Sequence, residues 1–357
     1  MAGPGAPPGH DRSRPTLSLP SQSRILVTGA NGFVGRHLVA ALLALSERPE
    51  AIIATTVQAD NAAPSGVCHA VMDITDAQQV RSVIAQHRPT HLFHLAAISG
   101  VPAAERAIRN TWAVNLDGTL NIALSIADEV PECRLLYCSS AFIYGTSFLS
   151  GKPVDEGTLL APFNPYGASK AAADLLIGQM AAQGLRAIRL RPFNHTGVGQ
   201  SEDFVVPAFA AQIAQIERGE KEPVLQVGDL SARRDFLDVR DVVEAYLRAM
   251  LRFDDLPRGC AMNIASGRAV SIKEVLDILL ALSGKPVEIR AQRDRMRPID
   301  APIILGDATL ARRLLDWTPR YELKATLASI LQAMRAGPGR QQAGQPAAST
   351  REPQKAK

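Results

Sequence analysis

Cysteine is scarce in this chain, with 4 thiols among 357 residues. Cys68, Cys133, Cys138 and Cys260 form no CxxC pair and no metal-ligand spacing, so the sequence predicts neither a disulfide framework nor a metal site. We expect reduced, buried thiols, as in a cytoplasmic protein. No apolar run approaches the ~18 residues that cross a bilayer, and residues 1–22 lack the apolar segment of a secretory signal. The sequence therefore predicts no membrane partner.

Most of the chain also carries no net positive charge. The formal net charge of +4 arises from a net +1 in residues 1–22 and a net +3 in residues 337–357, so residues 23–336 are neutral in sum. A neutral folded part gives no electrostatic reason to bind a polyanion, and we expect no nucleic-acid partner. Both ends are rich in Pro, Gly, Gln and Ser, a composition typical of disordered tails.

Short apolar, β-rich runs alternate with helical patterns through the first half of the chain. Their nearly continuous apolar character is typical of parallel strands buried on both faces. This alternation predicts an α/β fold, a Rossmann-type doubly wound parallel sheet, over residues 23–194. The expected strands are 24–29, 51–57, 67–73, 91–97, 134–140 and 186–193.

After about residue 195 the pattern loosens, and residues 195–336 are expected to form mainly a smaller C-terminal α+β region. Some of its segments are expected to return to the first domain. We expect a helix over 204–218, strands near 224–227 and 261–264, and a helix opened by the capping box Ser271…Glu274. A further helix is expected to start at Asp307.

A glycine-rich turn joins the first expected strand to an apolar helix. Its spacing is GxxGxxG, at Gly29, Gly32 and Gly35, in place of the more familiar GxGxxG. Glycine lets a pyrophosphate approach a helix N-terminus, and it lets the helix pack close to the strand. The turn therefore predicts a dinucleotide-binding domain with contacts from Gly29, Asn31, Gly32, Phe33, Val34 and Gly35.

The second expected strand lacks the carboxylate that would bind the ribose 2′-hydroxyl of NAD. Residues 55–58 read Thr, Thr, Val and Gln, which accommodate a 2′-phosphate, although no arginine adjoins them. This favours NADP(H), with NAD(H) still possible, and places Thr55 at the cofactor. Asp73 and Ile74 follow the third strand and are expected either to meet the adenine or to cap a helix, two compatible roles.

A serine, a tyrosine and a lysine, residue types suited to acid–base chemistry, stand at an informative spacing in the sequence. Tyr166 and Lys170 are four apart at the start of a helical pattern, so they share one helix face. A nearby ammonium favours phenolate, which predicts that Lys170 lowers the pKa of Tyr166. Ser140 follows an expected strand at the sheet edge where ligands bind. We therefore expect Ser140 to hold a substrate oxygen while Tyr166 transfers its proton.

The order and spacing of these motifs resemble the extended short-chain dehydrogenases/reductases, the NAD-dependent epimerase/dehydratase superfamily, over residues 23–336. The superfamily's strand-end Leu95, Ala96 and Ala97 and its structural Asn115 are present. Residues 191–200, 226–230 and 233–242 are most similar to GDP-sugar enzymes, in particular to GDP-4-keto-6-deoxy-D-mannose reductases.

This resemblance implies NAD(P)H-dependent reduction of the C4 keto group of a nucleotide-linked 4-keto-6-deoxyhexose, forming GDP-D-rhamnose from a GDP-linked substrate. Its C4 epimer, GDP-6-deoxytalose, stays open as a product, because the sequence does not show which face of the carbonyl receives the hydride. It implies Ser140, Tyr166 and Lys170 as catalytic, and a homodimer. It further implies cofactor contacts from Leu95, Ala96, Ala97, Asn115, Tyr166, Lys170 and Pro192, and substrate contacts from Ser140, Asn194, Val205, Gln226, Arg234 and Arg297. Guanidinium forks suit a diphosphate, although Arg234 and Arg297 could instead form solvated ion pairs.

Several alternatives remain at this point. A 4,6-dehydratase of this superfamily needs a threonine and an acid after the serine, and Ala141 and Phe142 cannot supply the proton. A nucleotide-sugar 4-epimerase with recycled NAD needs no such acid and stays open, as does a non-catalytic dinucleotide-binding protein. His195 could touch substrate, but a structural role is expected for it and for His94.

Overall fold

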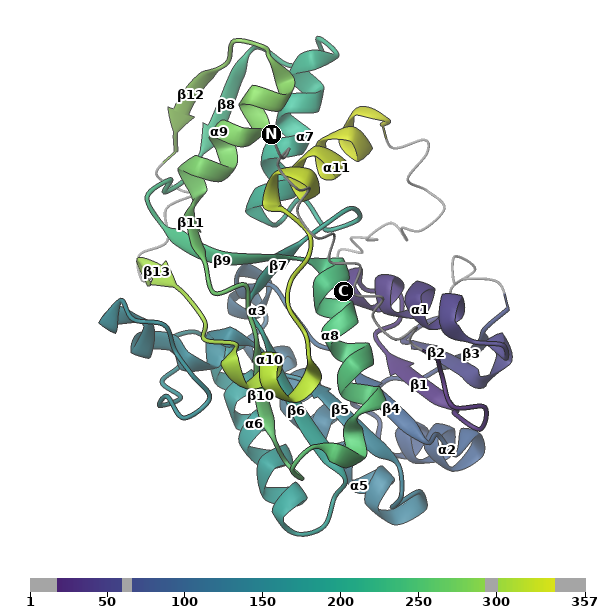
Figure 1. The fold of residues 1–357 in the computed structure, drawn as a ribbon. Helices are drawn as coiled ribbons and strands as arrows, with labels where there is room; N and C mark the ends of the chain where they lie inside the picture. The colour runs from purple at the N-terminus through teal and green to yellow at the C-terminus, as the bar shows by residue number, and fades with distance from the viewer. Residues whose placement is uncertain (1–17, 60–65, 293–300, 338–357) are drawn as a thin grey trace, which may run out of the picture.

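The computed structural model describes residues 18–59, 66–292 and 301–337, in which thirteen strands alternate with eleven α-helices (Figure 1). Most of both expected tails and Arg297 lie outside these ranges. The strands are β1 (Ile25–Thr28), β2 (Ile52–Thr56), β3 (Cys68–Val71), β4 (His91–His94), β5 (Arg134–Cys138), β6 (Ala187–Pro192), β7 (Asn194–Thr196), β8 (Val224–Val227), β9 (Arg233–Asp238), β10 (Ala261–Ile264), β11 (Ala269–Ser271), β12 (Glu288–Ala291) and β13 (Ile303–Ile304). The helices are α1 (Phe33–Leu45), α2 (Ala77–His87), α3 (Val101–Arg106), α4 (Ile108–Trp112), α5 (Gly118–Glu129), α6 (Pro165–Ala182), α7 (Val205–Glu217), α8 (Val239–Leu251), α9 (Ile272–Ser283), α10 (Thr309–Leu315) and α11 (Leu323–Arg335).

Seven parallel strands form the central sheet in the order β3-β2-β1-β4-β5-β6-β10. All six strands expected in the first half are present, each slightly shorter than its apolar run, and the predicted doubly wound sheet is confirmed. The chain fills the sheet in one direction from β1 to β3 and then in the other direction from β4 to β6, so the order of the strands reverses between β1 and β4. The crevice at the carboxyl ends of these strands is the position where open α/β sheets bind their ligands.

The sheet is buried on both faces, which explains the continuous apolar runs. Val27 packs into a core shared with α1 and α8, whereas its neighbour Leu26 packs into a second core with α2, α5 and α6. Successive residues of a strand point to opposite faces, which explains why Ile25, Leu26 and Val27 of β1 are all apolar. Fully burying each such side chain contributes about 1.5–3 kcal/mol. These two cores fix the strand ends that carry the site.

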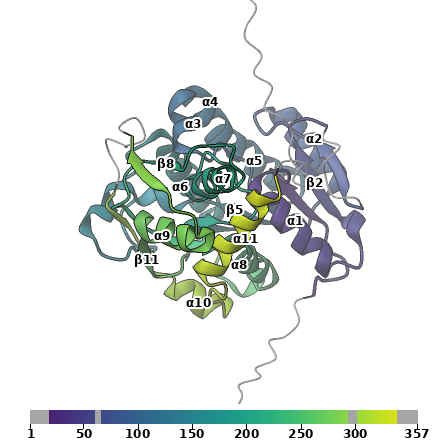
Figure 2. The ribbon, with the colours of Figure 1, turned by 90° about the horizontal axis from the view of Figure 1, so that it is seen from above.

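A smaller region with its own core contains α7, α9, α11 and β8, grouped to one end of the molecule (Figures 1 and 2). β8 pairs with β12, and β9 pairs with β7, β11 and β13. The expected capping box is present, with Ser271 and Glu274 each accepting the other's backbone N–H. The helix expected at Asp307 begins two residues later, because the Asp307 carboxylate accepts the N–H of Thr309.

Candidate active site

The glycine-rich turn lies between β1 and α1 and has no room for side chains. Gly29 has φ +66°, and a Cβ there would stand 2.9 Å from the backbone nitrogen of Ala96. A Cβ on Gly35 would stand 2.1 Å from the carbonyl oxygen of Gly29. Within the described residues no side chain caps α1 at Gly32, so its first N–H groups are available to an anion. This cradle fits the pyrophosphate of a dinucleotide.

A directed chain of hydrogen bonds holds the loop after β4 against this turn. The Thr28 hydroxyl accepts the N–H groups of Leu95 and Ala96 at 3.1 and 3.0 Å, so it donates to Nδ1 of His94 at 2.8 Å. Nε2 of His94 then donates to Thr119 at 3.0 Å. Burial lowers the pKa of His94 to about 3, which keeps the ring neutral as this chain requires. The structure thus agrees with a structural His94.

Asn115 lies in a π-helical turn between α4 and α5, a distortion often found at functional sites. Its side chain accepts from the N–H of Ile98 at 2.9 Å and donates to Ser169 on α6 at 3.0 Å. A further bond runs to the Ile98 carbonyl. Because its carboxamide is bonded at both ends within the protein, Asn115 positions the loop of Ala96 and Ala97 relative to α6. Direct contact of this side chain with the cofactor stays a prediction.

Ser140 and Tyr166 meet at the carboxyl edge of β5. Ser140 caps a short 3₁₀ segment, with Oγ accepting the N–H of Phe142 at 3.2 Å, and its hydroxyl is near enough to Tyr166 to influence the pKa of that phenol. Asn164 caps α6 through Gly167, 2.7 Å away, which fixes the first helical turn and with it Tyr166. Burial raises the pKa of Tyr166, and the nearby Ser140 hydroxyl offsets this rise in part. Tyr166 is therefore a protonated phenol at neutral pH.

Lys170 departs from the expectation based on its spacing. Its ammonium donates to the carbonyl of Cys138 at 2.5 Å and lies 4.4 Å from the ring centre of Tyr137. Burial lowers the pKa of Lys170 to about 8, against the opposing charges of Cys138 and Asp174. The predicted lowering of the Tyr166 pKa was wrong for this arrangement, because the ammonium is directed to the end of β5 and burial dominates at Tyr166.

A buried ion pair on α6, the helix of Tyr166 and Lys170, was missed by the sequence reasoning. Asp174, one turn after Lys170, is fully buried and receives both arms of Arg191, at 2.8 and 3.0 Å. Arg189 adds a third bond at 2.8 Å. Burial alone would raise the pKa of Asp174, but the two arginines outweigh it and hold this pKa below its usual value. This bidentate pair ties α6 to β6 and so fixes the helix that carries Tyr166.

The expected substrate residues fall on elements of the smaller region. Asn194 pairs with Phe236 in register, so Asn194 and Arg234 lie on the same face of the β7–β9 pair. The Oδ1 atom of Asn194 is buried without a hydrogen-bond partner in the described part of the chain, as expected for an atom that binds a ligand. Arg234 is 7% exposed, and its Nη1 donates to the carbonyl of Ala301 at 3.0 Å.

Val205 belongs to α7, and Gln226 belongs to β8, the strand that packs against α7. Val205 begins this helix and is 36% exposed, and the backbone of Gln226 is held from α7 by the side chain of Gln212. Pro192 ends β6, beside Asn194. Apart from Ser140, which follows β5, the described residues expected to bind substrate lie on β7, α7, β8 and β9, while Arg297 lies outside the described residues.

Two of the residues expected at the cofactor have buried side chains, so any contact they make would come from their backbone. The Thr55 side chain is buried in β2 and its hydroxyl donates to Val27, 3.4 Å away, so it does not point toward a ribose. Beyond it, Val57 is 64% exposed at the strand end. Ile74 packs its side chain into the core beside Gly118, which leaves only Asp73 of that pair with a partly exposed side chain. Helix α2 is capped by Asp76, three residues later.

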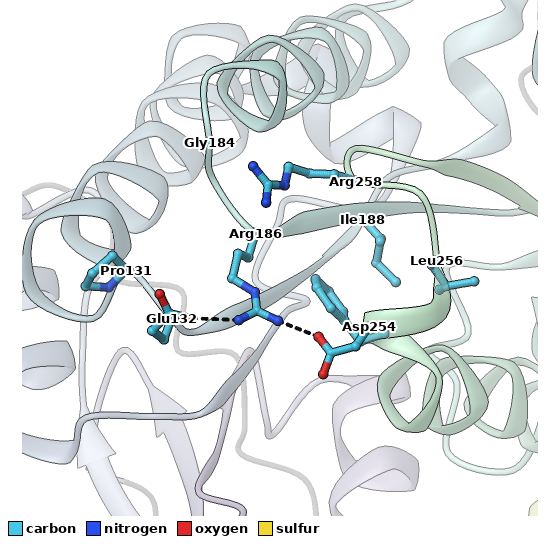
Figure 3. Close-up of a pocket in the computed structure, with 9 residues that line it drawn as sticks. Pro131, Glu132, Gly184, Arg186, Ile188, Asp254, Leu256 and Arg258 are labelled. Carbon is cyan, nitrogen blue, oxygen red and sulfur yellow. Dashed lines mark hydrogen bonds and ion pairs between the residues drawn. The ribbon is translucent and has the colours of Figure 1, made fainter.

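A cavity of about 400 Å³ lies at the opposite end of the sheet (Figure 3). Arg186 crosses it and donates to Glu132 at 2.7 Å and to Asp254. Arg186 and Glu132 precede β6 and β5, whereas Ser140 follows the carboxyl end of β5. Because open α/β sheets bind ligands at the carboxyl ends of their strands, this cavity is separate from the site of Tyr166.

Two further findings concern the described residues only. No group of three or more His, Cys, Asp or Glu side chains in them could hold a metal ion. None of their helices combines the length and apolar character needed to cross a membrane.

Residues 26–330 match the family model described as GDP-mannose 4,6 dehydratase. The chain belongs to this family. The resemblance inferred from the motifs is therefore confirmed, and with it the prediction of an NAD(P)-dependent enzyme.

Two related proteins and one solved structure are similar to this chain over most of its length. The GDP-6-deoxy-D-mannose reductase of Pseudomonas aeruginosa is 33% identical over 309 residues, 86% of this chain and 96% of that protein. The structure of RMD from Pseudomonas aeruginosa complexed with NADPH has a TM-score of 0.76 at 31% identity, covering 88% of this chain and 99% of that one. A UDP-glucose 4-epimerase of Rhizobium meliloti is 28% identical over 316 residues, 85% of this chain and 94% of that protein.

Proposed function

We propose that this chain reduces the C4 keto group of GDP-4-keto-6-deoxy-D-mannose, with NADPH as the favoured cofactor and GDP-D-rhamnose as the product. The observation that carries this proposal is the placement of Ser140 and Tyr166 together at the carboxyl end of β5, in the same sheet whose strand β1 ends at the glycine turn. A similar protein of Pseudomonas aeruginosa is named GDP-6-deoxy-D-mannose reductase, which supports the choice of substrate.

The protonation state of Tyr166 suits the direction of this reaction. A reduced nicotinamide supplies the hydride when bound, and the protein must supply a proton to the substrate oxygen. Tyr166 is buried and its raised pKa keeps that proton in place until it is needed. Ser140 orients the oxygen by hydrogen bonding, and Lys170 adds positive charge from the end of β5. An oxidation would instead need Tyr166 as the phenolate, which burial disfavours.

Dehydration is not supported, although the family is described by that activity. Ala141 is buried and Phe142 packs its ring at 5.8 Å against that of Tyr166, and neither side chain carries a proton to give to a leaving hydroxyl. Epimerisation remains the second candidate, because a relative at 28% identity is named UDP-glucose 4-epimerase. That reaction would use the same serine, tyrosine and lysine.

The assembly and the cellular compartment belong to the same proposal. Ile108, Leu124 and Leu175 are 51%, 47% and 59% exposed, on α4, α5 and α6, and both α4 and α5 pack against α6. Exposed apolar side chains on neighbouring helices suit an interface, and we expect a homodimer through these helices.

The four cysteines are free, which suits the reducing cytoplasm.

One assay separates the two candidate reactions. The purified protein is given GDP-4-keto-6-deoxy-D-mannose with NADPH, and NADPH consumption is followed by absorbance. We expect turnover, with the C4 configuration of the product read by NMR. In parallel, UDP-glucose is supplied with NAD and the formation of UDP-galactose is measured. Epimerisation without net NADPH consumption would overturn the reductase assignment.

A further inference from the structure

The first two turns of α1 contact residues 195–200, a loop segment made of the end of β7 and the turn after it. Arg36 carries the main connection. Its Nη1 donates to the carbonyl of Asn31 in the glycine turn at 2.7 Å, and its Nη2 donates to the carbonyl of Gly199 at 2.9 Å. The two arms of one guanidinium therefore join the cofactor turn to a loop 163 residues away in the chain.

Two neighbours of Arg36 strengthen this junction. His37 Nε2 donates to the carbonyl of Val198 at 2.9 Å. The ring of Phe33 lies parallel to that of His195, with 6.1 Å between centres and 7° between planes. His195 also donates from Nδ1 to the carbonyl of Phe193 at 2.9 Å, so it serves the loop structurally in this conformation.

Residues 195–200 are joined to one another by side-chain hydrogen bonds. Gln200 donates to the carbonyl of His195 at 3.1 Å and accepts from Thr196 at 2.8 Å. Asn194, with its unpaired Oδ1, immediately precedes this loop, and Val205 opens α7 shortly after it. A shift at residues 195–200 is therefore passed to both ends of the proposed substrate segment.

We propose that Arg36 is a positioning residue that couples dinucleotide binding to nucleotide-sugar binding. An anion on the first N–H groups of α1 fixes the glycine turn, including the Asn31 carbonyl. The Arg36 fork then holds the loop of Gly199 in its substrate-binding position. Since coupling is reciprocal, each ligand raises the affinity for the other by the same factor. The identity of the second ligand rests on the proposed function, but the effect of the first ligand on the loop does not.

Calorimetry tests the coupling with GDP as the probe of the substrate site. GDP affinity is measured with and without saturating NADPH, in the wild type, Arg36→Ala and Arg36→Lys. We expect NADPH to raise wild-type GDP affinity by about 5-fold or more, and to change it less than about 2-fold in both variants. Lysine keeps the charge but cannot span two carbonyls as a fork. The matched control is Arg81→Ala, a surface arginine paired with Glu129, which should keep the wild-type ratio.

Hydrogen–deuterium exchange of residues 195–204 with NADPH alone gives a readout that needs no substrate. We expect NADPH to slow exchange there in the wild type and in Arg81→Ala, and not in Arg36→Ala or Arg36→Lys. If GDP fails to bind but exchange behaves in this way, the proposed substrate is wrong and the coupling stands. The coupling is overturned if NADPH leaves wild-type exchange unaltered. It is equally overturned if the variants lower the affinities for NADPH and for GDP, while the ratio of GDP affinity with NADPH to that without NADPH stays at its wild-type value.

Discussion

The hydroxyl of Thr28 donates to Nδ1 of His94 at 2.8 Å while accepting two backbone N–H groups from the loop after β4. Thr28→Val keeps the shape of the side chain but leaves those N–H groups and the buried ring without their partner. Each unmet buried group costs about 1–3 kcal/mol, so we expect a loss of at least that size in the free energy of unfolding. Urea unfolding measures it.

Thr55→Val is the matched control for this prediction. Thr55 lies on the neighbouring strand and is equally buried, but its hydroxyl makes a single long bond of 3.4 Å to a carbonyl. We expect Thr55→Val to cost clearly less than Thr28→Val. Equal losses would mean that the chain through His94 adds nothing beyond the burial of a threonine.

The parts of the site that sequence could predict are those defined by neighbours in the chain. The glycine spacing predicts the cofactor turn, and the four-residue spacing of Tyr166 and Lys170 predicts one helix face. The direction of the Lys170 ammonium was not predictable, because it depends on a carbonyl at the end of β5. Arg36 was missed for a similar reason, since its second partner, Gly199, comes from a distant loop.

Tyr166→Phe removes the proton donor and leaves the ring in place. We expect kcat to fall by about 10²–10⁴, the usual contribution of a positioned acid. NADPH affinity should remain close to that of the wild type, because the glycine turn is untouched. Single-turnover kinetics and NADPH titration measure the two effects. Hydride transfer at the wild-type rate would remove Tyr166 from the mechanism.

The pH dependence of the reduction should report the titration of Lys170. Its pKa is lowered to about 8 by burial, so the ammonium is present below that pH and is lost as pH rises through it. We expect kcat/KM to be level toward neutrality and to fall above about pH 8. Lys170→Arg keeps its charge throughout this range. Its activity should be lower but without this alkaline limb, and an unchanged limb would assign the titration to another group.

Cofactor preference should respond to charge at the end of β2. Val57 is 64% exposed there, and residues 55–58 include no carboxylate. Val57→Asp should disfavour NADPH relative to NADH, because its carboxylate repels the 2′-phosphate. Asparagine has nearly the shape of aspartate but no charge, so Val57→Asn should keep the wild-type preference. The ratio of kcat/KM for the two cofactors is the measurement, and a strong wild-type preference for NADH would contradict the proposal.

Arg233 and Arg234 are adjacent on β9 and point to opposite sides, which makes them a matched pair. Arg234 is 7% exposed on the face shared with Asn194, whereas the side chain of Arg233 is 46% exposed and donates to Ala269. If Arg234 binds the substrate diphosphate, Arg234→Ala removes a bond made equally in the ground and transition states. Such a loss appears in KM and not in kcat.

A charged hydrogen bond is worth roughly 1.5–3 kcal/mol, so KM for the nucleotide-sugar should rise about 10- to 150-fold. Arg234 also donates to Ala301, so folding of the variant is checked by its unfolding midpoint. Arg234→Lys keeps the charge without the fork and should lie between the alanine variant and the wild type. Arg233→Ala should leave KM within about 2-fold, as expected for a residue outside the site. Weaker NADPH binding with unaltered GDP binding in Arg234→Ala would place this arginine at the cofactor and overturn its assignment to the substrate.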